Sequence, residues 1–287
     1  MSYNGETAYI TGGASGIGRA LAARLASKGV KIVIADRNLE GAEEVAREAN
    51  QQGQKAWAVQ VDVSDWESQR KGFEEAIDKL GGRINYVFAV AGIPESSWLP
   101  NRPNATTFEK PNLAVWDVNG TGPLYTAALA LQHYRRQSPG ANGFRGKIVI
   151  VASGCSFYYI PALPVYTASK HAVLGFVRSF GRYLPDEKIT LNAVCPNIVK
   201  TNISTGEFYQ KAEKRGLLCE TDNLIDAFES LMGTSATSGE AVEVLPGDEG
   251  FRIKEIPEYT TDKCRESVEM THDRSHRSFK FHQPVLD

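Results

Sequence analysis

Tyr166 and Lys170 are the pair of side chains in this sequence whose types and spacing suit proton transfer. Residues at positions i and i+4 lie on one face of a helix. A free phenol has a pKa of about 10 and is a poor base at neutral pH, but a nearby cation stabilises the phenolate and lowers that pKa. The pair is therefore predicted to exchange a proton with a substrate hydroxyl. Taken alone, the same spacing also fits an exposed helix face.

Two further polar residues are candidates for the same chemistry. Ser153 directly follows the strand-like run 147–152, and the carboxyl ends of parallel strands are where ligands gather in such folds. Its hydroxyl is predicted to hold the substrate oxygen beside Tyr166. Asn119 lies in a helical stretch that contains Gly120, Gly122 and Pro123, so we expect a kink there. A kink exposes backbone groups that can bind an ordered water.

A glycine-rich loop joins the first strand-like run to the first helix, with the sequence Thr11-Gly12-Gly13-Ala14-Ser15-Gly16-Ile17-Gly18. Glycine allows a tight turn and a close approach to a diphosphate, and the free N–H groups at a helix start favour negative charge. The loop is therefore predicted to bind a dinucleotide through Gly12, Ser15, Gly16, Ile17 and Gly18. The alternative is an ordinary glycine-rich turn between a strand and a helix.

Asp36 ends the second strand-like run, where an acidic side chain meets the adenosine ribose of a dinucleotide. A carboxylate there accepts hydrogen bonds from ribose hydroxyls and repels a 2′-phosphate, so NAD is favoured over NADP. Arg37 complicates this prediction because an Arg at this position can hold a phosphate. Asp36 is also compatible with a role in capping the next helix.

The elements that position these residues alternate between short apolar strands and helices with apolar stripes. Strands that are apolar on both faces and alternate with helices predict a parallel sheet covered on each side by crossovers. We expect an α/β fold, a single doubly wound Rossmann domain with a parallel seven-stranded sheet flanked by helices. The expected strands are 7–11, 31–36, 55–61, 84–90, 147–152, 189–194 and 239–244, and the expected helices are 17–28, 39–51, 65–80, 113–136 and 165–184.

Three segments fall outside this alternation. Residues 94–111 form a loop rich in Pro, Asn and Thr, and residues 201–220 are predicted to be a flap over the substrate. We therefore assign residues 1–250 to the catalytic domain and 251–287 to a C-terminal extension, in which 271–287 form an arm or a frayed tail.

Composition excludes several classes of protein. The 287 residues carry 32 basic and 34 acidic side chains, for a net charge of −2, with 42% apolar residues. This balance argues against a disordered chain, a nucleic-acid binder with a basic face and a polybasic membrane-surface protein. No secretory signal is visible, and the longest apolar run, 86–93, is far below the roughly 20 residues that span a bilayer.

The cysteines and histidines predict no metal site. The cysteines, Cys155, Cys195, Cys219 and Cys264, form no Cys-x-x-Cys pair, which favours a reduced, cytoplasmic protein. His272, His276 and His282 fall in a polar tail, and we expect no metal there.

The order of these features resembles the short-chain dehydrogenase/reductase family over about residues 5–245. The residues that carry the resemblance are the glycine loop, Asp36, Asp62-Val63, Asn119, Ser153, Tyr166-x-x-x-Lys170 and Pro196-x-x-Val199-x-Thr201. The resemblance implies that Tyr166 is the acid/base, that Lys170 lowers its pKa and binds the nicotinamide ribose, and that Ser153 orients the substrate oxygen. It further implies a water held by Asn119 in a relay with Lys170, adenine between Asp62 and Val63, and the carboxamide at Thr201.

Two positions depart from the family pattern. The chain has Ala89-Val90-Ala91-Gly92 where the family has Asn-Asn-Ala-Gly, so we expect the loop under the adenine to lose steadying hydrogen bonds, although Ala91 and Gly92 are still assigned to the cofactor. The usual Pro-Gly is Pro196-Asn197, and we expect Asn to preserve the turn because it tolerates unusual backbone angles.

The predicted substrate is a hydrophobic alcohol or ketone. Within the family, residues 164–171, 191–196 and 239–244 most resemble the NAD-dependent hydroxyprostaglandin dehydrogenase group, and similar chains serve in fungal secondary metabolism. Aromatic and thiol side chains near the strand ends suggest a flat or lipid-like ligand, or else packing against the flap. The residues assigned to the substrate are Ser153, Cys155, Tyr159, Tyr166, Trp98 and Phe208.

Several alternatives remain open at this point. The resemblance implies a homodimer or homotetramer built on the helices 113–136 and 165–184. The chemistry is reversible, so a reductase forming the alcohol fits as well as a dehydrogenase. A sensor or template that binds the dinucleotide without redox chemistry is the alternative outside enzymes.

Overall fold

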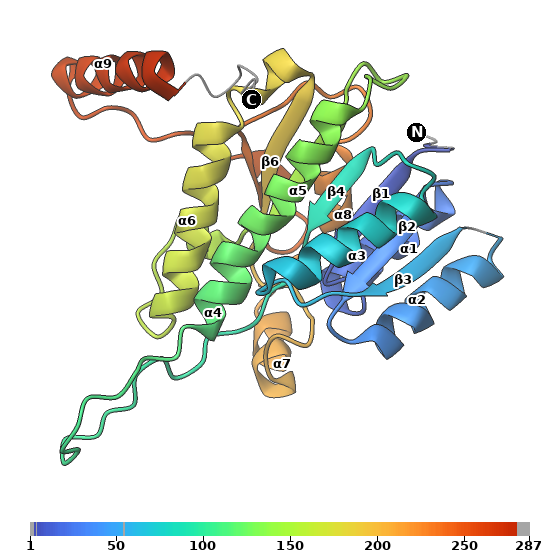
Figure 1. The fold of residues 1–287 in the computed structure, drawn as a ribbon. Helices are drawn as coiled ribbons and strands as arrows, with labels where there is room; N and C mark the ends of the chain where they lie inside the picture. Colours follow the sequence, from blue (N-terminus) through green and yellow to red (C-terminus); the bar gives the residue numbers. More distant parts are fainter. Residues whose placement is uncertain (1–2, 4, 54, 280–287) are drawn as a thin grey trace. The chain divides into compact units, whose positions relative to one another are not determined.

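The computed structural model describes residue 3, residues 5–53 and residues 55–279, and it divides the chain into two units, 1–253 and 254–287. In the first unit one sheet has the strand order β3-β2-β1-β4-β5-β6-β7-β8 (Figure 1). The first seven strands pair in parallel. They are β1 (Thr7–Thr11), β2 (Lys31–Asp36), β3 (Ala56–Gln60), β4 (Tyr86–Ala89), β5 (Gly146–Val151), β6 (Ile189–Pro196) and β7 (Ala241–Val244).

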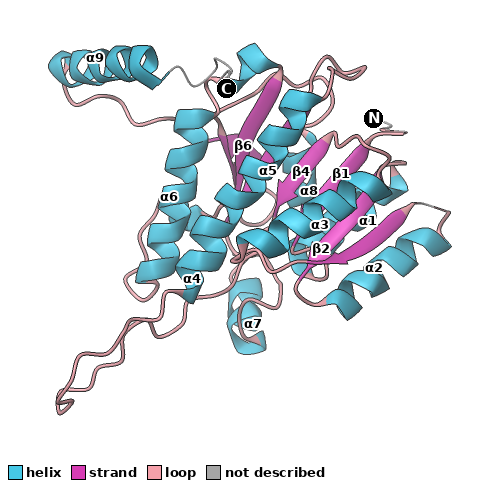
Figure 2. Cartoon of the chain, in the orientation of Figure 1, coloured by secondary structure: helices cyan, strands magenta, loops and turns pink. Residues whose placement is uncertain are grey.

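Helices cover both faces of this sheet (Figure 2). Alternate residues of each strand point to opposite faces, so that Ile10 and Ile34 belong to one buried cluster while Tyr9 and Val33 belong to the other. The first cluster is closed by α1 (Gly16–Ser27), α2 (Leu39–Gln51) and α8 (Thr221–Glu229). The second is closed by α3 (Trp66–Lys79), α5 (Gly122–Arg136) and α6 (Pro164–Phe180). The predicted doubly wound α/β fold is confirmed.

The strand order reverses between β1 and β4. The chain runs from β1 outward to β3, then returns to β4 on the other side of β1. Neighbouring crossovers therefore leave in opposite directions at this point, and a crevice opens at the carboxyl ends of the two strands. The glycine loop follows β1, so the fold places it in that crevice.

The sheet has one more strand than the sequence predicts. Residues Phe251–Ile253 form β8, which pairs antiparallel with β7 through Val242 opposite Ile253 and Val244 opposite Phe251. These residues were assigned to the extension, but they return along the edge of β7 after a turn at Gly247 and Gly250. A three-residue strand shows too little alternation to be recognised from sequence.

The predicted kink in the helix 113–136 is a π-helical turn. Residues Asp117–Thr121 form this turn between α4 (Ala114–Trp116) and α5. A π-turn widens the helix locally and is frequent at functional sites. It places Asn119 beside the loop that follows β4.

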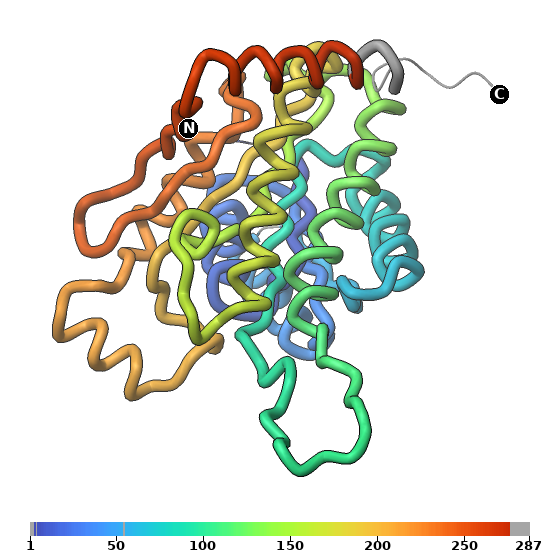
Figure 3. The backbone as a smooth tube through the Cα atoms, turned by 90° about the vertical axis from the view of Figure 1, so that its left-hand side faces the viewer, coloured from blue at the N-terminus to red at the C-terminus, as the bar shows by residue number. Residues whose placement is uncertain are grey.

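Two surface segments frame the carboxyl end of the sheet. Residues 90–113 contain no helix or strand and form a long excursion in Figure 3. The predicted flap contains the helix α7 (Gly206–Lys214), which is capped by Thr205 through the Phe208 amide at 3.3 Å. Shorter 3₁₀ turns occupy Gly154–Ser156 and Leu184–Glu187.

The second unit contains the helix α9 (Asp262–Phe279), where the sequence suggested an arm or frayed tail from 271 onward. The Thr261 hydroxyl accepts a hydrogen bond from the Cys264 amide at 3.2 Å and caps the helix start, and an ion pair joins Asp262 to Arg265. These local contacts extend helical structure into a strongly polar segment.

Candidate active site

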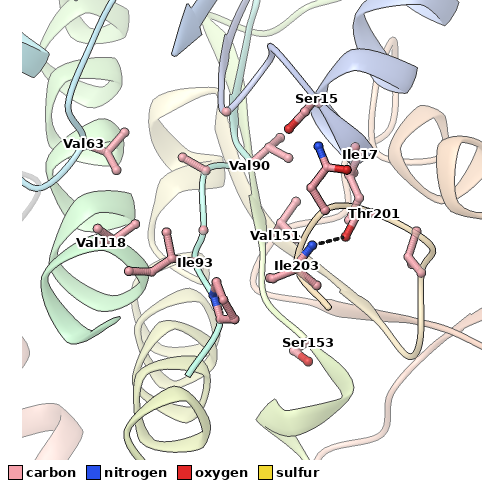
Figure 4. Close-up of a pocket in the computed structure, with 18 of the residues that line it drawn as sticks. Ser15, Ile17, Val63, Val90, Ile93, Val118, Val151, Ser153, Thr201 and Ile203 are labelled. Carbon is pink, nitrogen blue, oxygen red and sulfur yellow. Dashed lines mark hydrogen bonds between the residues drawn. The ribbon is translucent and has the colours of Figure 1, made fainter. Parts of the chain in front are cut away.

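A cavity of about 390 Å³ lies at the carboxyl ends of the strands (Figure 4). Its wall contains every residue predicted to bind the cofactor, together with Ser153. Those residues are Gly12, Ser15, Gly16, Ile17, Gly18, Asp36, Arg37, Asp62, Val63, Ala91, Gly92, Tyr166, Lys170, Pro196, Val199 and Thr201. The fold thus brings residues that are far apart in the sequence to one site.

The glycine loop has the geometry of a diphosphate cradle. Gly12 has φ +69°, and a Cβ atom there would lie 2.6 Å from the Cα atom of Ala91. Gly18 packs so closely that a Cβ atom would lie 2.2 Å from the Gly12 carbonyl oxygen. Gly16 has φ +51° and faces Thr201, whose Cγ2 atom would be 3.1 Å from a Cβ atom. Side chains at Gly12 and Gly18 would collide with the backbone that forms this tight turn, so the loop requires glycine there and the residues present fit a dinucleotide diphosphate.

Asp36 is held with its carboxylate at the cavity. Oδ2 accepts a hydrogen bond from the Ala14 amide at 3.0 Å, and Oδ1 accepts one from the Asn38 amide at 2.9 Å. The cap of α2 is Asn38, which accepts from the Gly41 amide at 3.2 Å, so Asp36 does not cap that helix. A carboxylate has about four acceptor sites, which leaves capacity for ribose hydroxyls.

Asp62 is oriented by the residue two positions on. The amide and hydroxyl of Ser64 donate to Asp62 Oδ1 at 2.9 and 2.6 Å. The hydrogen bond from the Ser64 hydroxyl is the largest cause that lowers the pKa of Asp62. Burial raises this pKa, while the Ser64 amide and, to a smaller extent, Arg37 lower it further.

Tyr166, Lys170 and Ser153 meet in the same cavity. The Lys170 Nζ atom lies 5.6 Å from the centre of the Tyr166 ring and donates to the Val151 carbonyl oxygen at 2.9 Å. The Ser153 Oγ atom accepts from the Cys155 amide at 3.1 Å. The predicted helix spacing therefore places the phenol and the ammonium on the face of α6 that lines the cavity.

The predicted lowering of the Tyr166 pKa by Lys170 is wrong for the protein by itself. Burial raises the pKa of Tyr166 to about 12, with the hydrogen bond to Ser153 acting in the opposite direction. Burial also lowers the pKa of Lys170 to about 8. Loss of solvation therefore sets the direction of both pKa shifts.

Asn119 is fully buried and does not line the cavity. Its Oδ1 atom accepts from the Ile93 amide at 2.8 Å, and its Nδ2 atom donates to the Ile93 carbonyl oxygen at 2.9 Å. The side chain therefore holds the loop after β4. The predicted water relay would use backbone groups of the π-turn, and it stays a prediction.

The loop under the predicted adenine site keeps its hydrogen bonds without the usual Asn pair. The Thr11 hydroxyl accepts from the amides of Val90 and Ala91 at 3.2 and 3.4 Å. Asn119 holds the next turn through Ile93. The amides of this loop therefore have partners, and the expected loss of the hydrogen bonds that two Asn side chains would make stays a prediction.

The Pro196-Asn197 turn survives for a different reason than expected. Among the described non-glycine residues only Lys188 has a positive φ, so Asn197 has an ordinary backbone conformation. Its Nδ2 atom donates to the Val244 carbonyl oxygen at 2.9 Å and to Glu243 at 3.3 Å. The amide side chain ties the end of β6 to β7.

Four of the residues predicted to bind substrate do not line the cavity. Tyr159 is 85% exposed, and Trp98 and Phe208 are also exposed, while Cys155 is buried and outside the lining of the cavity. In the flap it is Tyr209 that turns inward, with its hydroxyl 3.4 Å from the Thr201 hydroxyl. Helical periodicity puts adjacent residues on different faces, and the sequence alone does not show which face is buried.

Apolar side chains that were not predicted from the sequence line the cavity on both sides. Figure 4 shows Ile93 and Val118 on the side of Val63, with Val90 and Val151 closer to Ser15 and Ile17. The lining residues that were not predicted are the apolar Val61, Val90, Ile93, Pro94, Val118, Val151, Ala152 and Ile203, together with the polar Asn197 and Asn202. Most of these residues are next in sequence to a predicted site residue, and this adjacency is the signal from which they could have been predicted.

The fold and this site define a dinucleotide-binding oxidoreductase of the Rossmann type. The chain belongs to the short-chain dehydrogenases, because the family model described as short chain dehydrogenase matches residues 6–212. The family binds a nicotinamide dinucleotide, and the resemblance noted in the sequence is confirmed.

Individual relatives agree with this assignment. The human 15-hydroxyprostaglandin dehydrogenase [NAD(+)] is 32% identical over 224 residues, covering 77% of each chain. Versicolorin reductase of Emericella nidulans is 32% identical over 202 residues, covering 70% of this chain and 71% of its own. The crystal structure of 3-ketoacyl-(acyl-carrier-protein) reductase from Brucella melitensis complexed with NADH has a TM-score of 0.72 at 28% identity, covering 85% of this chain and 98% of its own.

Neither a membrane-spanning helix nor a metal-binding cluster occurs among the described residues. No helix in them is long and apolar enough to cross a membrane. No group of three or more His, Cys, Asp or Glu residues in them is arranged to hold a metal ion. His282 lies outside the described residues.

Proposed function

We propose that the protein is an NAD-dependent oxidoreductase that interconverts a secondary alcohol and a ketone on a hydrophobic small molecule. The observation that carries the proposal is that Tyr166, Lys170 and Ser153 line the same cavity as the glycine loop. Bound nicotinamide would supply the hydride acceptor or donor. The chain's own residues would manage the proton and the substrate oxygen.

In oxidation, the Tyr166 oxygen takes the proton of the substrate hydroxyl, and in reduction it returns a proton to the carbonyl oxygen. Ser153 donates a hydrogen bond to that oxygen and holds it beside the phenol. One of the three N–H groups of the Lys170 ammonium donates to the Val151 carbonyl oxygen. The other two are left for the nicotinamide ribose and for passing protons to and from Tyr166. Because Ile93, Pro94 and Val118 make part of the wall apolar, the hydroxyls of Ser153 and Tyr166 would set the orientation of the substrate.

Asp36 supports NAD as the cofactor. Its carboxylate lies at the cavity and is locked by two backbone amides, so it would stay in place to repel a 2′-phosphate. The human relative is named for NAD(+). Arg37, which also lines the cavity, is the residue that favours NADP.

The apolar wall and the small net charge support a hydrophobic substrate. The names of two relatives specify a hydroxyprostaglandin and a versicolorin. One is named a dehydrogenase and the other a reductase, so both directions are to be assayed. Appearance or loss of NADH absorbance across a panel of hydrophobic alcohols and ketones would identify the substrate class and the direction.

Tyr166→Phe tests the mechanism. The phenyl ring keeps the packing but has no proton to give or take, so turnover should fall at least a hundredfold while NADH binding, measured by fluorescence, stays within about twofold. Tyr159→Phe is the matched control, because it makes the same change at an exposed position outside the cavity. Unchanged turnover in Tyr166→Phe would reject the mechanism.

We also propose that the protein forms a homodimer or homotetramer and that it is located in the cytoplasm. Leu113, Trp116 and Leu124 expose apolar area around α4 and the start of α5, which supports assembly through this region. The cytoplasmic location rests on the cysteine pattern of the sequence. Light scattering of the purified protein should give at least twice the monomer mass, and Leu124→Arg should lower it.

A further inference from the structure

The helix that carries Tyr166 and Lys170 begins without a cap of its own. Its N-cap residue is Leu163, which has no side-chain acceptor, and Pro164 follows at the first helical position. The first N–H groups of a helix have no partner within it, and Pro removes one of them. The amides of Val165 and Tyr166 therefore need acceptors from elsewhere.

Glu95 supplies an acceptor from a distant part of the chain. Its Oε2 atom accepts a hydrogen bond from the Tyr166 amide at 2.8 Å. A carboxylate at a helix N-terminus is favoured by the helix dipole, and a charge-assisted hydrogen bond is stronger than a neutral one. The residue that carries the phenol is thus held directly by the loop 90–113.

The base of this loop is itself fixed. Ile93, two residues before Glu95, is bonded to both polar groups of the Asn119 side chain. The contact from Glu95 to α6 therefore starts from an anchored point near the cavity. Ile93 and Pro94 line the cavity, so the same short segment forms part of its wall and holds the start of α6.

The second oxygen of Glu95 favours a role for the carboxylate beyond capping the helix. Oε1 is buried and has no hydrogen-bond partner among the described residues. An unpaired buried carboxylate oxygen lowers stability, whereas Ser, Thr, Asp or Asn at position 163 would cap the helix locally without that cost.

We propose that Glu95 is a positioning residue that sets the place of the Tyr166 phenol relative to Ser153 by capping α6 from the loop 90–113. The inference rests on the proposed function, because it assigns Tyr166 the proton transfer. Displacing a catalytic group by about 1 Å can lower a rate about a hundredfold, so the start of α6 needs to be well fixed.

Three variants separate the reach of the Glu95 side chain from its charge. Glu95→Gln keeps an oxygen acceptor at the same distance, Glu95→Asp keeps the charge but is one methylene shorter, and Glu95→Ala removes both. We expect Glu95→Gln to keep kcat within about threefold of the wild type. The other two should lower kcat about tenfold to a hundredfold, with the Kd for NADH within about twofold.

Hydrogen exchange gives a readout that does not depend on turnover. In Glu95→Ala, the amides at the start of α6 should exchange faster than in the wild type, and Glu95→Gln should restore their protection. Glu109→Ala is the matched control, because Glu109 lies in the same loop but pairs with the exposed Arg102. It should change neither kcat nor exchange in α6.

Two results would overturn the inference. One is a Glu95→Ala protein with wild-type kcat and wild-type exchange in α6. The other is a Glu95→Gln protein as impaired as Glu95→Ala, since the acceptor geometry would then not be what matters. A wild-type protein with no turnover on any alcohol or ketone would reject the proposed function, while the exchange experiment would still decide whether Glu95 holds α6.

Discussion

The Lys170 ammonium donates a hydrogen bond to the Val151 carbonyl oxygen at 2.9 Å, which joins the middle of α6 to the last residue of β5. Lys170 is 3% exposed. The bond aims the charged group at the cavity and satisfies one of its donors, but burial of the charge still opposes protonation. We therefore expect buried Lys170 to lower the stability of the fold, because its position serves catalysis.

Replacing Lys170 with Met should stabilise the protein at pH 7 while abolishing turnover. Burial lowers the pKa of Lys170 from 10.5 to about 8, which corresponds to a cost of about 3 kcal/mol when the group is protonated. Met has a similar volume and no charge, but it leaves the Val151 carbonyl unpaired. We expect a net gain of about 2 kcal/mol in urea unfolding of the dinucleotide-free protein.

The gain should depend on pH in a defined direction. Below pH 8 Lys170 is protonated in both states, and between pH 8 and 10.5 the unfolded chain binds more protons than the folded one. The wild type therefore gains stability as pH rises through this window, and the advantage of Lys170→Met should shrink by pH 10. An advantage that is the same at pH 7 and pH 10 would contradict this account.

Replacing Asp36 with Ala should lower the ratio of kcat/KM with NAD to kcat/KM with NADP at least tenfold, because a 2′-phosphate would no longer meet a carboxylate. Asp36→Asn is the matched control. It keeps an oxygen acceptor for one of the two backbone amides but has no charge, so it should change the ratio with less loss of NAD affinity. An unaltered ratio in both variants would count against the ribose role.

Replacing Gly12 with Ala should destabilise the protein and weaken NADH binding. The new Cβ atom would lie 2.6 Å from the backbone of Ala91, at a position with φ +69°. Gly81→Ala is the control, because Gly81 has φ +77° with open space around it. It should cost only the backbone strain of about 1 kcal/mol, whereas Gly12→Ala adds a clash. If Gly12→Ala and Gly81→Ala had equal effects on unfolding and on NADH binding, the close approach of Gly12 to Ala91 would not explain why glycine is needed here.

The rate of alcohol oxidation should rise with pH between 6 and 8. Burial raises the pKa of Tyr166 to about 12, so the phenolate that accepts the proton increases about tenfold per pH unit in this range. Ketone reduction uses the protonated phenol and should stay nearly constant. Measuring kcat/KM in both directions checks this, and a plateau in oxidation below pH 8 would show that Tyr166 titrates lower in the working complex.

Much of the site could be predicted from sequence because its signals are local. The loop from Gly12 to Gly18 and the spacing of Tyr166 and Lys170 each depend on a few adjacent residues and one type of element. The alternation of strands and helices then places strand ends together, which is why the residues assigned to the cofactor all line one cavity.

The rest required tertiary structure because it depends on desolvation and on partners far along the chain. The composition of the sequence does not show that burial raises the Tyr166 pKa, or that Tyr209 rather than Phe208 turns inward. The cap that Glu95 gives to α6 joins residues 71 positions apart. The sequence by itself determined the fold and the set of chemical groups, since these follow from short-range periodicity and residue type. Only the tertiary structure decided how those groups are held and ionised, because both depend on which distant segments exclude water around them.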